Sequence, residues 1–340
     1  MKKVKILTDI KIMQSPIWQK KTNYVEDIDP KLTKIFNKLS DRLPLNLKAF
    51  FNFILIIKHM KGYDVIITAN IKTGQMIALF KKLLNIKSTR QIILELMLDE
   101  EVQTIKWKIK RMIQKFIFSS MDIIFVSSTR EVKTYSRRFN LPENQFKFLH
   151  FHTNITEPRI IQRPNSYILS AGRTGRDYHT LAEAVRGLPV EVVFICDSKS
   201  IKGVSLPENV KLFINIPREQ YLELIKNCRF VVVPLEKRVK STGQVVILEA
   251  MAFGKPVIAT DTVGTMDYIT HKQTGMLVSS KDSVSLKNAI LELLNNQSLQ
   301  NTISVNAFKF IKEDCTFERY VTNILEVAEN ITSRKDRPYV

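Results

Sequence analysis

Short apolar runs alternate with longer segments of helical periodicity along the whole chain. In the first half, runs of strand length predict strands at Val4–Leu7, Asp64–Thr68, Gln91–Leu96, Asp122–Val126 and Phe146–Leu149. The segments between them predict helices at Pro30–Leu39, Leu45–Met60, Thr73–Leu84, Val102–Ser119 and Thr129–Phe139. Strands that alternate with helices of this length predict parallel sheets joined by right-handed crossovers.

The alternation starts again after a polar stretch with two prolines, Thr153–Asn165, which we interpret as a linker. The second series predicts strands at Ser166–Ser170, Val190–Cys196, Lys211–Ile214, Phe230–Val233, Pro256–Ala259 and Met276–Val278. The fold class is therefore α/β, with two Rossmann-like domains that face a cleft. We expect domains over residues 1–153 and 154–315, followed by a C-terminal helix and tail, 316–340, that packs on the N-terminal domain.

The charge of the chain is uneven. The 340 residues carry a net charge of +19, and the first 155 contain 28 of the 52 Lys and Arg but only 13 of the 33 Asp and Glu. The N-terminal half is therefore expected to face an anionic partner: nucleic acid, an acidic membrane surface or a phosphorylated substrate.

Cysteines and histidines give no sign of a metal site. Cys196, Cys228 and Cys315 are far apart and lie in or beside apolar or helical segments, which is typical of buried free thiols in a reducing cytoplasm. The pair His150 and His152 would point to opposite faces of a strand. No apolar run approaches the roughly 20 residues that a membrane span needs.

A Gly-containing cationic turn follows the strand that ends near Ser170. Gly172 and Gly175 allow close approach of a ligand to the backbone, while the guanidinium groups of Arg173 and Arg176 match phosphate oxygens. The segment therefore predicts a diphosphate site. The alternative is an ordinary basic turn with Asp177 as helix cap.

A second segment with the same character follows the strand Phe230–Val233 and a short basic loop. Ser241, Thr242, Gly243 and Gln244 mark the beginning of a helix, where uncapped N–H groups and hydroxyls bind anions. Glu249 lies on this otherwise apolar helix and needs hydrogen-bond donors if it is buried, for which ligand hydroxyls are suited. The alternative places Glu249 on the solvent face.

The helix predicted at Val102–Ser119 has two apolar faces. One stripe is expected to face the core and consists of Ile105, Ile109, Met112, Ile113 and Phe116. The opposite side is expected to rest in lipid headgroups and contains Trp107, Arg111 and Phe118 with Lys110 and Lys115 beside them. The alternatives are that the two aromatic residues pack under a neighbouring loop or mediate a dimer.

The stretch from Ile168 to about Asn295 resembles the donor-binding domain of glycosyltransferase family 4, the retaining group 1 enzymes of GT-B fold. The matching segments, in family order, are Gly172–Ala184, Val231–Leu235, Leu248–Asp261 and Thr274–Val278. A weaker match covers Asp122–Tyr135 in the first half.

The resemblance implies roles for individual residues. Arg173 and Arg176 would contact the donor's diphosphate, and Glu249 would bind the ribose of the nucleotide. Ser241 stands where the family has a carboxylate that helps to hold the transferred sugar. This departure leaves nucleotide binding intact and makes the sugar uncertain.

The N-terminal half departs further from the family. The segment Thr8–Tyr24, where members have a Gly-rich loop, contains no glycine. The family's catalytic-site histidine is also missing, and Glu95 and Asp99 lie nearest to its position, although a helix-start acidic cluster explains them equally well. With His152, these residues are the candidates on the acceptor side.

The expected function is transfer of a sugar, with retention, from a UDP- or GDP-sugar to a lipid-linked or polysaccharide-precursor acceptor. The resemblance implies that the nucleotide-sugar is a substrate, that there is no cofactor and that no metal is obligatory. We expect a cytoplasmic protein associated peripherally with the inner face of the cell membrane. The rivals are a catalytically silent GT-B partner subunit and a basic nucleic-acid-binding protein, but no nucleic-acid recognition signature is present, so no nucleic-acid partner is expected.

Overall fold

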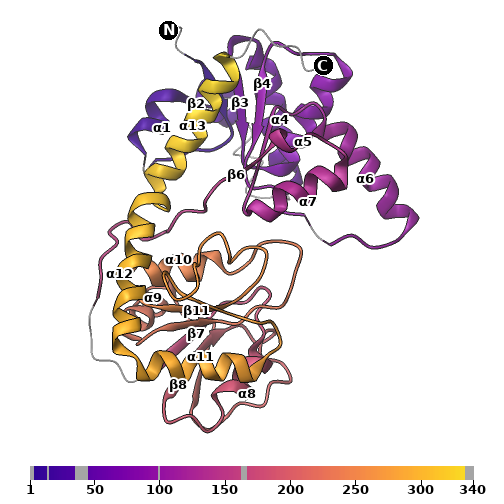
Figure 1. Ribbon diagram of the computed structural model, residues 1–340. Helices are drawn as coiled ribbons and strands as arrows, with labels where there is room; N and C mark the ends of the chain where they lie inside the picture. Colours follow the sequence, from indigo (N-terminus) through magenta and orange to yellow (C-terminus); the bar gives the residue numbers. More distant parts are fainter. Residues whose placement is uncertain (1–3, 14, 35–44, 99, 162–166, 334–340) are drawn as a thin grey trace. The chain divides into compact units, whose positions relative to one another are not determined.

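The computed structural model describes residues 4–13, 15–34, 45–98, 100–161 and 167–333. The chain divides into two compact units (Figure 1). The amino-terminal unit contains residues 1–149 together with the chain from Val321 onward, and the carboxyl-terminal unit contains His150–Tyr320. Each is built on its own six-stranded parallel sheet, which confirms the predicted α/β class with two Rossmann-like domains.

The sheet of the amino-terminal unit has the order β2-β1-β3-β4-β5-β6. All its neighbouring strands are parallel, and most of their residues are buried. The bounds of these strands are β1 Ile6–Thr8, β2 Thr22–Tyr24, β3 Val65–Thr68, β4 Arg90–Ile93, β5 Ile123–Val126 and β6 Phe146–Phe148. Each strand expected in this half is present, with its ends shifted by up to three residues.

The helices of this unit follow the expected order. Their bounds are α1 Pro16–Lys21, α2 Val25–Ile28, α4 Leu45–His59, α5 Ile71–Leu83, α6 Ile105–Phe118 and α7 Thr129–Phe139, with single 3-10 turns at Met60–Gly62 and Glu143–Gln145. The helix expected at Pro30–Leu39 extends beyond the described residues. Within the unit, α4 contacts α5, α5 contacts α6, and α6 contacts α7.

The segment after β1, which the sequence pattern left as a glycine-free loop, contains a short helix and a strand. Ser15 caps α1 by accepting a hydrogen bond from the backbone of Trp18, and Pro16 occupies the first helical turn. β2 then pairs with β1, starting from Ile6 opposite Thr22. Both elements, of six and three residues, are too short for a repeating apolar pattern to show in the sequence.

The orientation expected for α6 is wrong. The buried residues of this helix are Gln114, Ile117 and Phe118, and the rings of Phe118 and Phe139 meet edge to face at 5.0 Å. The stripe that was expected to face the core is exposed instead: Ile105, Ile109, Met112, Ile113 and Phe116. Two apolar faces competed in the sequence, and the position of α7 decided which of them is covered.

The sheet of the carboxyl-terminal unit has the order β12-β11-β10-β7-β8-β9 and is also parallel throughout. Its strands lie within about a residue of the expected ranges: β7 Tyr167–Ala171, β8 Glu191–Cys196, β9 Val210–Ile214, β10 Val231–Val233, β11 Val257–Thr260 and β12 Met276–Val278. The core lies on both faces of this sheet.

The helices of this unit are α8 Tyr178–Val185, α9 Arg218–Asn227, α10 Gln244–Ala252, α11 Ser283–Asn295 and α12 Gln297–Asp314, and α13 Phe317–Ser333 starts here. α10 is buried over nearly its whole length. From Val321, α13 belongs to the amino-terminal unit, where Glu329 accepts a 2.5 Å bond from Lys21.

The described part of the predicted linker is attached to the carboxyl-terminal unit. Thr153 donates its backbone N–H to Cys315, Arg159 to Ala252, and Ile161 to Phe253. The contact-based boundary between the units falls between residues 149 and 150.

All three cysteines are buried free thiols, as predicted. Within the described ranges, no group of three His, Cys, Asp or Glu side chains has an arrangement that would hold a metal ion. Nor does any helix in those ranges combine the length and apolar character that crossing a bilayer requires.

Candidate functional site

The strand order of the carboxyl-terminal sheet reverses between β7 and β10. β7 leads to β8 and β9 on one side, and β10 leads to β11 and β12 on the other. In open parallel sheets the chain leaves such a reversal in opposite directions, so a crevice forms at the carboxyl ends of the two strands. The two segments predicted to bind a diphosphate follow these two strands.

The structure brings these segments together. The cationic turn, Gly172–Arg176, follows β7 directly and is tied to the chain beyond β10 by two backbone hydrogen bonds. Glu236 donates to Gly175 at 3.0 Å, and Asp177 donates to Pro234 at 3.1 Å. Asp177 also caps α8 by accepting from Thr180. The cap that was considered as an alternative to a ligand site is therefore present in the same turn that holds the arginines.

Arg176 is held by the turn itself. Its Nε donates to the carbonyl of Ala171 at 2.8 Å, and its Nη1 donates to that of Thr174 at 3.1 Å. Burial lowers the pKa of this guanidinium. Among the described residues, no carboxylate lies within ion-pair distance of Arg176. The arrangement leaves a half-buried, positioned cation with remaining N–H groups for an anion.

The two glycines of the turn have distinct tasks. Gly172 has φ +122°, and a Cβ at this position would lie 2.3 Å from Nη2 of Arg176. Gly175 has φ +66°, and a Cβ there would approach Nε of Arg238 at 3.2 Å and Oγ1 of Thr242 at 3.4 Å. The first glycine makes room for the arginine, and the second lets the turn approach the loop before α10.

Arg173 is the exposed member of the turn. Its backbone carbonyl accepts a 2.9 Å bond from Ser200. The hydrogen bonds from Ser200 hold the pKa of the Asp197 carboxyl below its usual range, and the charge of Arg173 adds to this effect. The side chain is thus available to solvent at the carboxyl edge of the sheet.

The beginning of α10 has no side-chain cap. Gly243, with φ +97°, is the N-cap residue, so the first N–H groups of the helix receive no bond from its side chain. Ser241 and Gln244 are buried, while Thr242 is half-buried. Nε2 of Gln244 is buried without a hydrogen-bond partner. Uncapped helix N–H groups beside hydroxyl and amide side chains suit an anionic or sugar ligand.

Gly264, which lies outside both predicted segments, packs against the residues at the start of α10. A Cβ at Gly264 would lie 2.6 Å from Nε2 of Gln244 and 2.8 Å from Cβ of Ser241. The loop after β11 therefore packs directly on the residue that replaces the family's carboxylate. Only a glycine allows this approach without displacing Gln244.

Glu249 is completely buried, so its placement on a solvent face is wrong. Its carboxylate accepts a 2.5 Å bond from Nη2 of Arg218 and a 2.7 Å bond from the hydroxyl of Tyr221, both on α9. Burial raises the pKa of Tyr221, and the Glu249 carboxylate raises it further. The donors that a buried carboxylate requires are supplied by the protein in the absence of a ligand.

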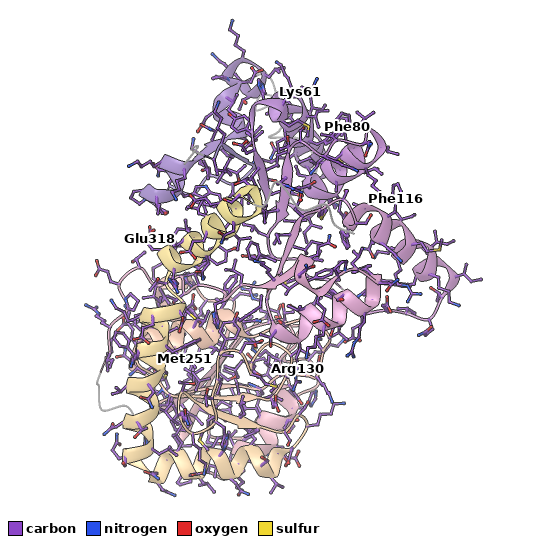
Figure 2. The ribbon with its side chains drawn as sticks, turned by 45° about the horizontal axis from the view of Figure 1, so that its top comes forward. Lys61, Phe80, Phe116, Arg130, Met251 and Glu318 are labelled. Atoms are coloured by element: carbon purple, nitrogen blue, oxygen red, sulfur yellow. The ribbon has the colours of Figure 1, made fainter. Side chains whose placement is uncertain are left out.

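These two groups of side chains belong to one site. The charge of Arg176 lowers the pKa of Tyr221, and Tyr221 raises the pKa of Arg176, so the two side chains are close enough to interact. The cationic turn, the start of α10 and the carboxylate of Glu249 therefore gather at one edge of the sheet; Met251, labelled in Figure 2, marks α10. Such a site offers guanidinium groups and helix N–H groups to a diphosphate. The carboxylate of Glu249 is fully buried, and each of its oxygens accepts a hydrogen bond from a side chain of α9.

The amino-terminal sheet has its own reversal of strand order, between β1 and β3. Asp9 follows β1 at this edge, and its Oδ1 accepts a 2.9 Å bond from the backbone of Ala69, which follows β3. The second oxygen, Oδ2, is buried without a hydrogen-bond partner. Burial raises the pKa of Asp9 to about 6. A half-buried carboxylate therefore follows the strand at the reversal in this unit.

The candidates on the acceptor side lie in different places. Glu95 follows β4 with φ +53°, a left-handed conformation that is strained for a glutamate, and Asp99 lies outside the described residues. His152 belongs to the carboxyl-terminal unit and packs edge to face on Phe317 and Tyr320. Their acceptor role stays a prediction.

Of the residues expected to contact a membrane, some are exposed and others are not. Arg111, Lys110 and Lys115 are exposed, whereas Phe118 is in the core and is not available to lipid. Trp107 is half-buried and lines a shallow pocket with Val102 and Gln103, with Nζ of Lys110 4.2 Å from the centre of its ring. Trp107 therefore packs beside a neighbouring segment, which is the alternative considered from the sequence.

Sequence reasoning missed five residues of these edges: Asp9, Arg218, Tyr221, Arg238 and Gly264. Arg238 belongs to the basic loop before α10 and pairs with Glu236 at 2.5 Å. The basic character of that loop was the one available signal. Arg218, Tyr221 and Gly264 carry no local motif, because they reach the donor edge from elements far away in the chain, and Asp9 is a single carboxylate after a strand.

Residues 157–310, less than half of the chain, match the model of the family described as glycosyl transferases group 1. An uncharacterized glycosyltransferase of Methanocaldococcus jannaschii is 29% identical over 158 residues, which are 45% of this chain and 44% of that protein. The N,N'-diacetylbacillosaminyl-diphospho-undecaprenol alpha-1,3-N-acetylgalactosaminyltransferase of Campylobacter jejuni is 27% identical over 117 residues, 34% of this chain and 30% of that one. The chain thus spans less than half the length of these curated relatives.

Among solved structures, the Anabaena protein HepE in complex with UDP and glucose is similar over nearly the whole chain. The TM-score is 0.65, the sequence identity is 16%, and the match covers 97% of this chain and 99% of that one. At this identity the likeness shows the fold, which is GT-B.

Proposed function

We propose that this protein is a retaining glycosyltransferase that takes a sugar from a UDP- or GDP-sugar. Its acceptor would be a lipid-linked or polysaccharide-precursor molecule at the inner membrane surface. The match to the group 1 model supports the reaction class, because it covers the cationic turn, α10 and Glu249. HepE, which has the same fold, was solved with UDP and glucose.

The observation that carries the proposal is the environment of Arg176. A guanidinium that is half-buried, anchored by two carbonyl groups and without a carboxylate partner among the described residues costs free energy unless an anion binds there. It follows a strand at which the strand order reverses, in a turn whose Gly175 approaches Thr242, just before the uncapped start of α10. A diphosphate satisfies all three features at once.

Each residue then has a task in the transfer. Arg173 and Arg176 would bind the diphosphate and stabilise its charge as the bond to the anomeric carbon breaks, which is usually the largest electrostatic contribution to catalysis. Thr242 and the first N–H groups of α10 would hold the same phosphates. Glu249 would accept hydrogen bonds from ribose hydroxyls, with its carboxylate kept in place by Arg218 and Tyr221.

In the retaining reaction that the resemblance implies, the new bond from the acceptor oxygen forms on the face that the diphosphate leaves. The acceptor's proton moves to an oxygen of the departing phosphate, so the step needs no protein base. Ser241 and Gln244 would then contact the transferred sugar in place of the family's carboxylate. Neutral donors at this position alter which hydroxyls are held and leave the phosphate contacts unchanged.

Two observations support a membrane-borne acceptor. The Campylobacter relative is named for a diphospho-undecaprenol acceptor, and the amino-terminal half of this chain carries most of the excess positive charge. A basic surface is attracted to anionic lipid headgroups and to a lipid diphosphate.

The test is calorimetric titration with UDP and GDP. We expect the Arg173→Ala and Arg176→Ala variants to lose about tenfold or more in affinity, since hydrogen bonds to charged groups contribute about 1.5–3 kcal/mol. Arg186→Ala removes a guanidinium that is exposed like that of Arg173 and that donates to the carbonyl of Ser205, and it serves as the matched control. Unchanged affinity in both site variants would refute the diphosphate assignment.

Ser241 favours a second candidate, a catalytically silent GT-B partner subunit that binds nucleotide and transfers nothing. Transfer of labelled sugar from UDP- or GDP-sugars to lipid in membrane extracts distinguishes the two. Transfer, or hydrolysis of the donor, that disappears in Arg176→Ala rejects the silent subunit. Nucleotide binding without either reaction across the donor panel supports it.

A further inference from the structure

An apolar stripe on α6 is exposed in this structure. It consists of Ile105, Ile109, Met112, Ile113 and Phe116, whose exposed fractions lie between 46% and 77%. The spacing of these residues places them along one side of the helix. An unbroken row of large apolar side chains on a surface helix is a feature of interaction sites, since isolated exposed apolar residues are scattered singly.

The helix is attached by its last turn. Its buried residues, Gln114, Ile117 and Phe118, all lie in the carboxyl-terminal half. The amino-terminal half, up to Ile113, has no buried residue, and Trp107 is its only half-buried one. Figure 1 shows this half projecting away from the sheet, and Phe116, labelled in Figure 2, lies on the outer side of the helix.

Cations border the stripe. α6 contains Lys106, Lys108, Lys110, Arg111 and Lys115, all of them exposed, and no acidic residue. Nζ of Lys82, from α5, lies 5.5 Å from the ring centre of Phe116 and extends this margin to the neighbouring helix. One of these cations, Arg111, forms an ion pair with Glu101 at a distance of 3.9 Å.

The neighbouring helices also expose apolar side chains. α5 contacts α6 and exposes Leu79 and Leu83, and Leu84, the residue after its last turn, is exposed as well. The next helix, α4, contacts α5 and exposes Leu47, Phe50 and Ile54. Aliphatic and aromatic residues are therefore presented by three successive helices of one unit.

We propose that the exposed stripe of α6, with its lysine margin, binds the surface of an anionic membrane. The apolar side chains would enter the boundary between headgroups and acyl chains. The lysine stems would lie along the same apolar layer, and their ammonium groups would reach the lipid phosphates. The proposal names the surface by which the proposed glycosyltransferase meets a membrane-borne acceptor, and to that extent it rests on the proposed function.

The cations beside the stripe favour an anionic lipid surface over a second copy of the chain or a nucleic acid as its partner. A second copy of the chain that covered the stripe face to face would bring the same five cations against each other without an acidic residue from α6 to compensate. Nucleic acid would use the cations and leave the apolar row in water. An anionic bilayer satisfies both components together.

The experiment is sedimentation with vesicles of phosphatidylcholine mixed with phosphatidylglycerol, compared with phosphatidylcholine alone. We expect the full chain to bind the anionic vesicles and to dissociate with salt. The triple variant Ile109→Ser, Met112→Ser, Ile113→Ser should bind them at least about tenfold less. These positions are exposed, so the substitutions should leave the thermal unfolding transition unchanged.

Two further variants complete the design. Val284→Ser with Val305→Ser removes equally exposed apolar groups from the other unit and should bind like the parent. Lys106→Gln, Lys108→Gln, Lys115→Gln should weaken anionic binding and reduce its dependence on salt. Equal binding of the parent to neutral vesicles, or unaltered binding of the serine variant, overturns the proposal. So does loss of self-association in the serine variant, measured by analytical ultracentrifugation, without an effect on vesicles.

Titration of the serine variant with UDP separates this inference from the proposed function. Normal UDP affinity with lost vesicle binding supports the surface and leaves the donor site untouched. A parent that binds UDP and no vesicles refutes the surface alone, and a parent that binds vesicles and neither UDP nor GDP refutes the proposed function alone.

Discussion

The two units are both built on a six-stranded parallel sheet with one reversal of strand order, and they differ in the charge that they place at that reversal. In both sheets the strand order reverses once, and a polar side chain follows a strand that ends there. The carboxyl-terminal unit presents Arg176, a cation held by backbone carbonyls, whereas the amino-terminal unit presents Asp9, a half-buried carboxylate. The topology thus provides the edge, and the residue type decides whether it attracts or repels a phosphate.

The units also differ in how their helices are covered. α10 is enclosed almost completely, so its exposed feature is its amino-terminal end, where the proposed diphosphate site lies. α6 is covered along one side of its last turns and leaves its larger apolar stripe exposed. A ligand is therefore expected at a helix end in one unit and along a helix side in the other.

The largest effect should come from truncating a side chain on the buried face of α6, compared with one on its exposed face. Phe118→Ala removes a fully buried ring that packs on Phe139 and should lower the free energy of unfolding by about 3–5 kcal/mol. Ile109→Ala, on the exposed stripe, should change it by less than about 0.5 kcal/mol. Urea denaturation measures both. The opposite ranking would restore the orientation expected from the sequence.

The next effect concerns the cationic turn. Gly172→Ala introduces a Cβ into the space of the Arg176 guanidinium and a side chain at φ +122°. We expect UDP affinity to fall about 10- to 100-fold because the guanidinium must move away from the phosphate position. Calorimetry gives the affinity, and Gly187→Ala, which has open space for a Cβ at φ +72°, controls for backbone strain alone. Equal affinity in the two variants would contradict the steric explanation.

A smaller effect is expected at the buried carboxylate. Glu249→Gln leaves Arg218 without its charged partner, and because the Arg218 side chain is 45% exposed, the loss of stability should be about 2 kcal/mol, below that of a fully buried pair. A double-mutant cycle with Tyr221→Phe measures the coupling between the Glu249 carboxylate and the Tyr221 hydroxyl. Additive effects would contradict an energetic contribution from this hydrogen bond.

The smallest effect should appear at the edge of the amino-terminal sheet. The pKa of Asp9 is raised to about 6, so the native protein holds this proton at pH values where the unfolded chain has released it. Stability should therefore decrease as the pH rises from about 4 to about 6, and the penalty should persist above that window. Asp9→Asn should remove this dependence and stabilise the protein at neutral pH by about 1 kcal/mol, given that Asp9 is only half-buried. Urea denaturation below and above the window tests it, and an unchanged pH profile would contradict the assignment.

The donor edge was largely predictable because its residues follow strands within a few positions. Arg176 and Gly172 are adjacent to β7 in the chain, and Gly243 directly precedes α10, so local pattern and spacing locate them. Arg218 and Tyr221 were not predictable in this way. They lie on α9, about thirty residues before Glu249, and carry no motif that points to a carboxylate.

The same reasoning explains the error in α6. Its sequence contains two apolar faces, and counting large residues selects the wider one. Burial of Phe118 depends on Phe139, which arrives from α7 after an intervening strand. Similarly, α1 and β2 are too short for their periodicity to be recognised, although Ser15 and Pro16 provide a helix-start signal.

The alternation of strands and helices, the two-unit organisation, the cationic turn and the uneven charge follow from the amino-acid sequence alone. These are local or additive properties, so they can be obtained from neighbouring residues and from composition. The tertiary structure decided which face of α6 is covered, which donors hold Glu249, and that Gly264 closes on Gln244. Burial and hydrogen bonding of this kind depend on pairs of elements far apart in the chain, and their geometry exists only once the elements have packed together.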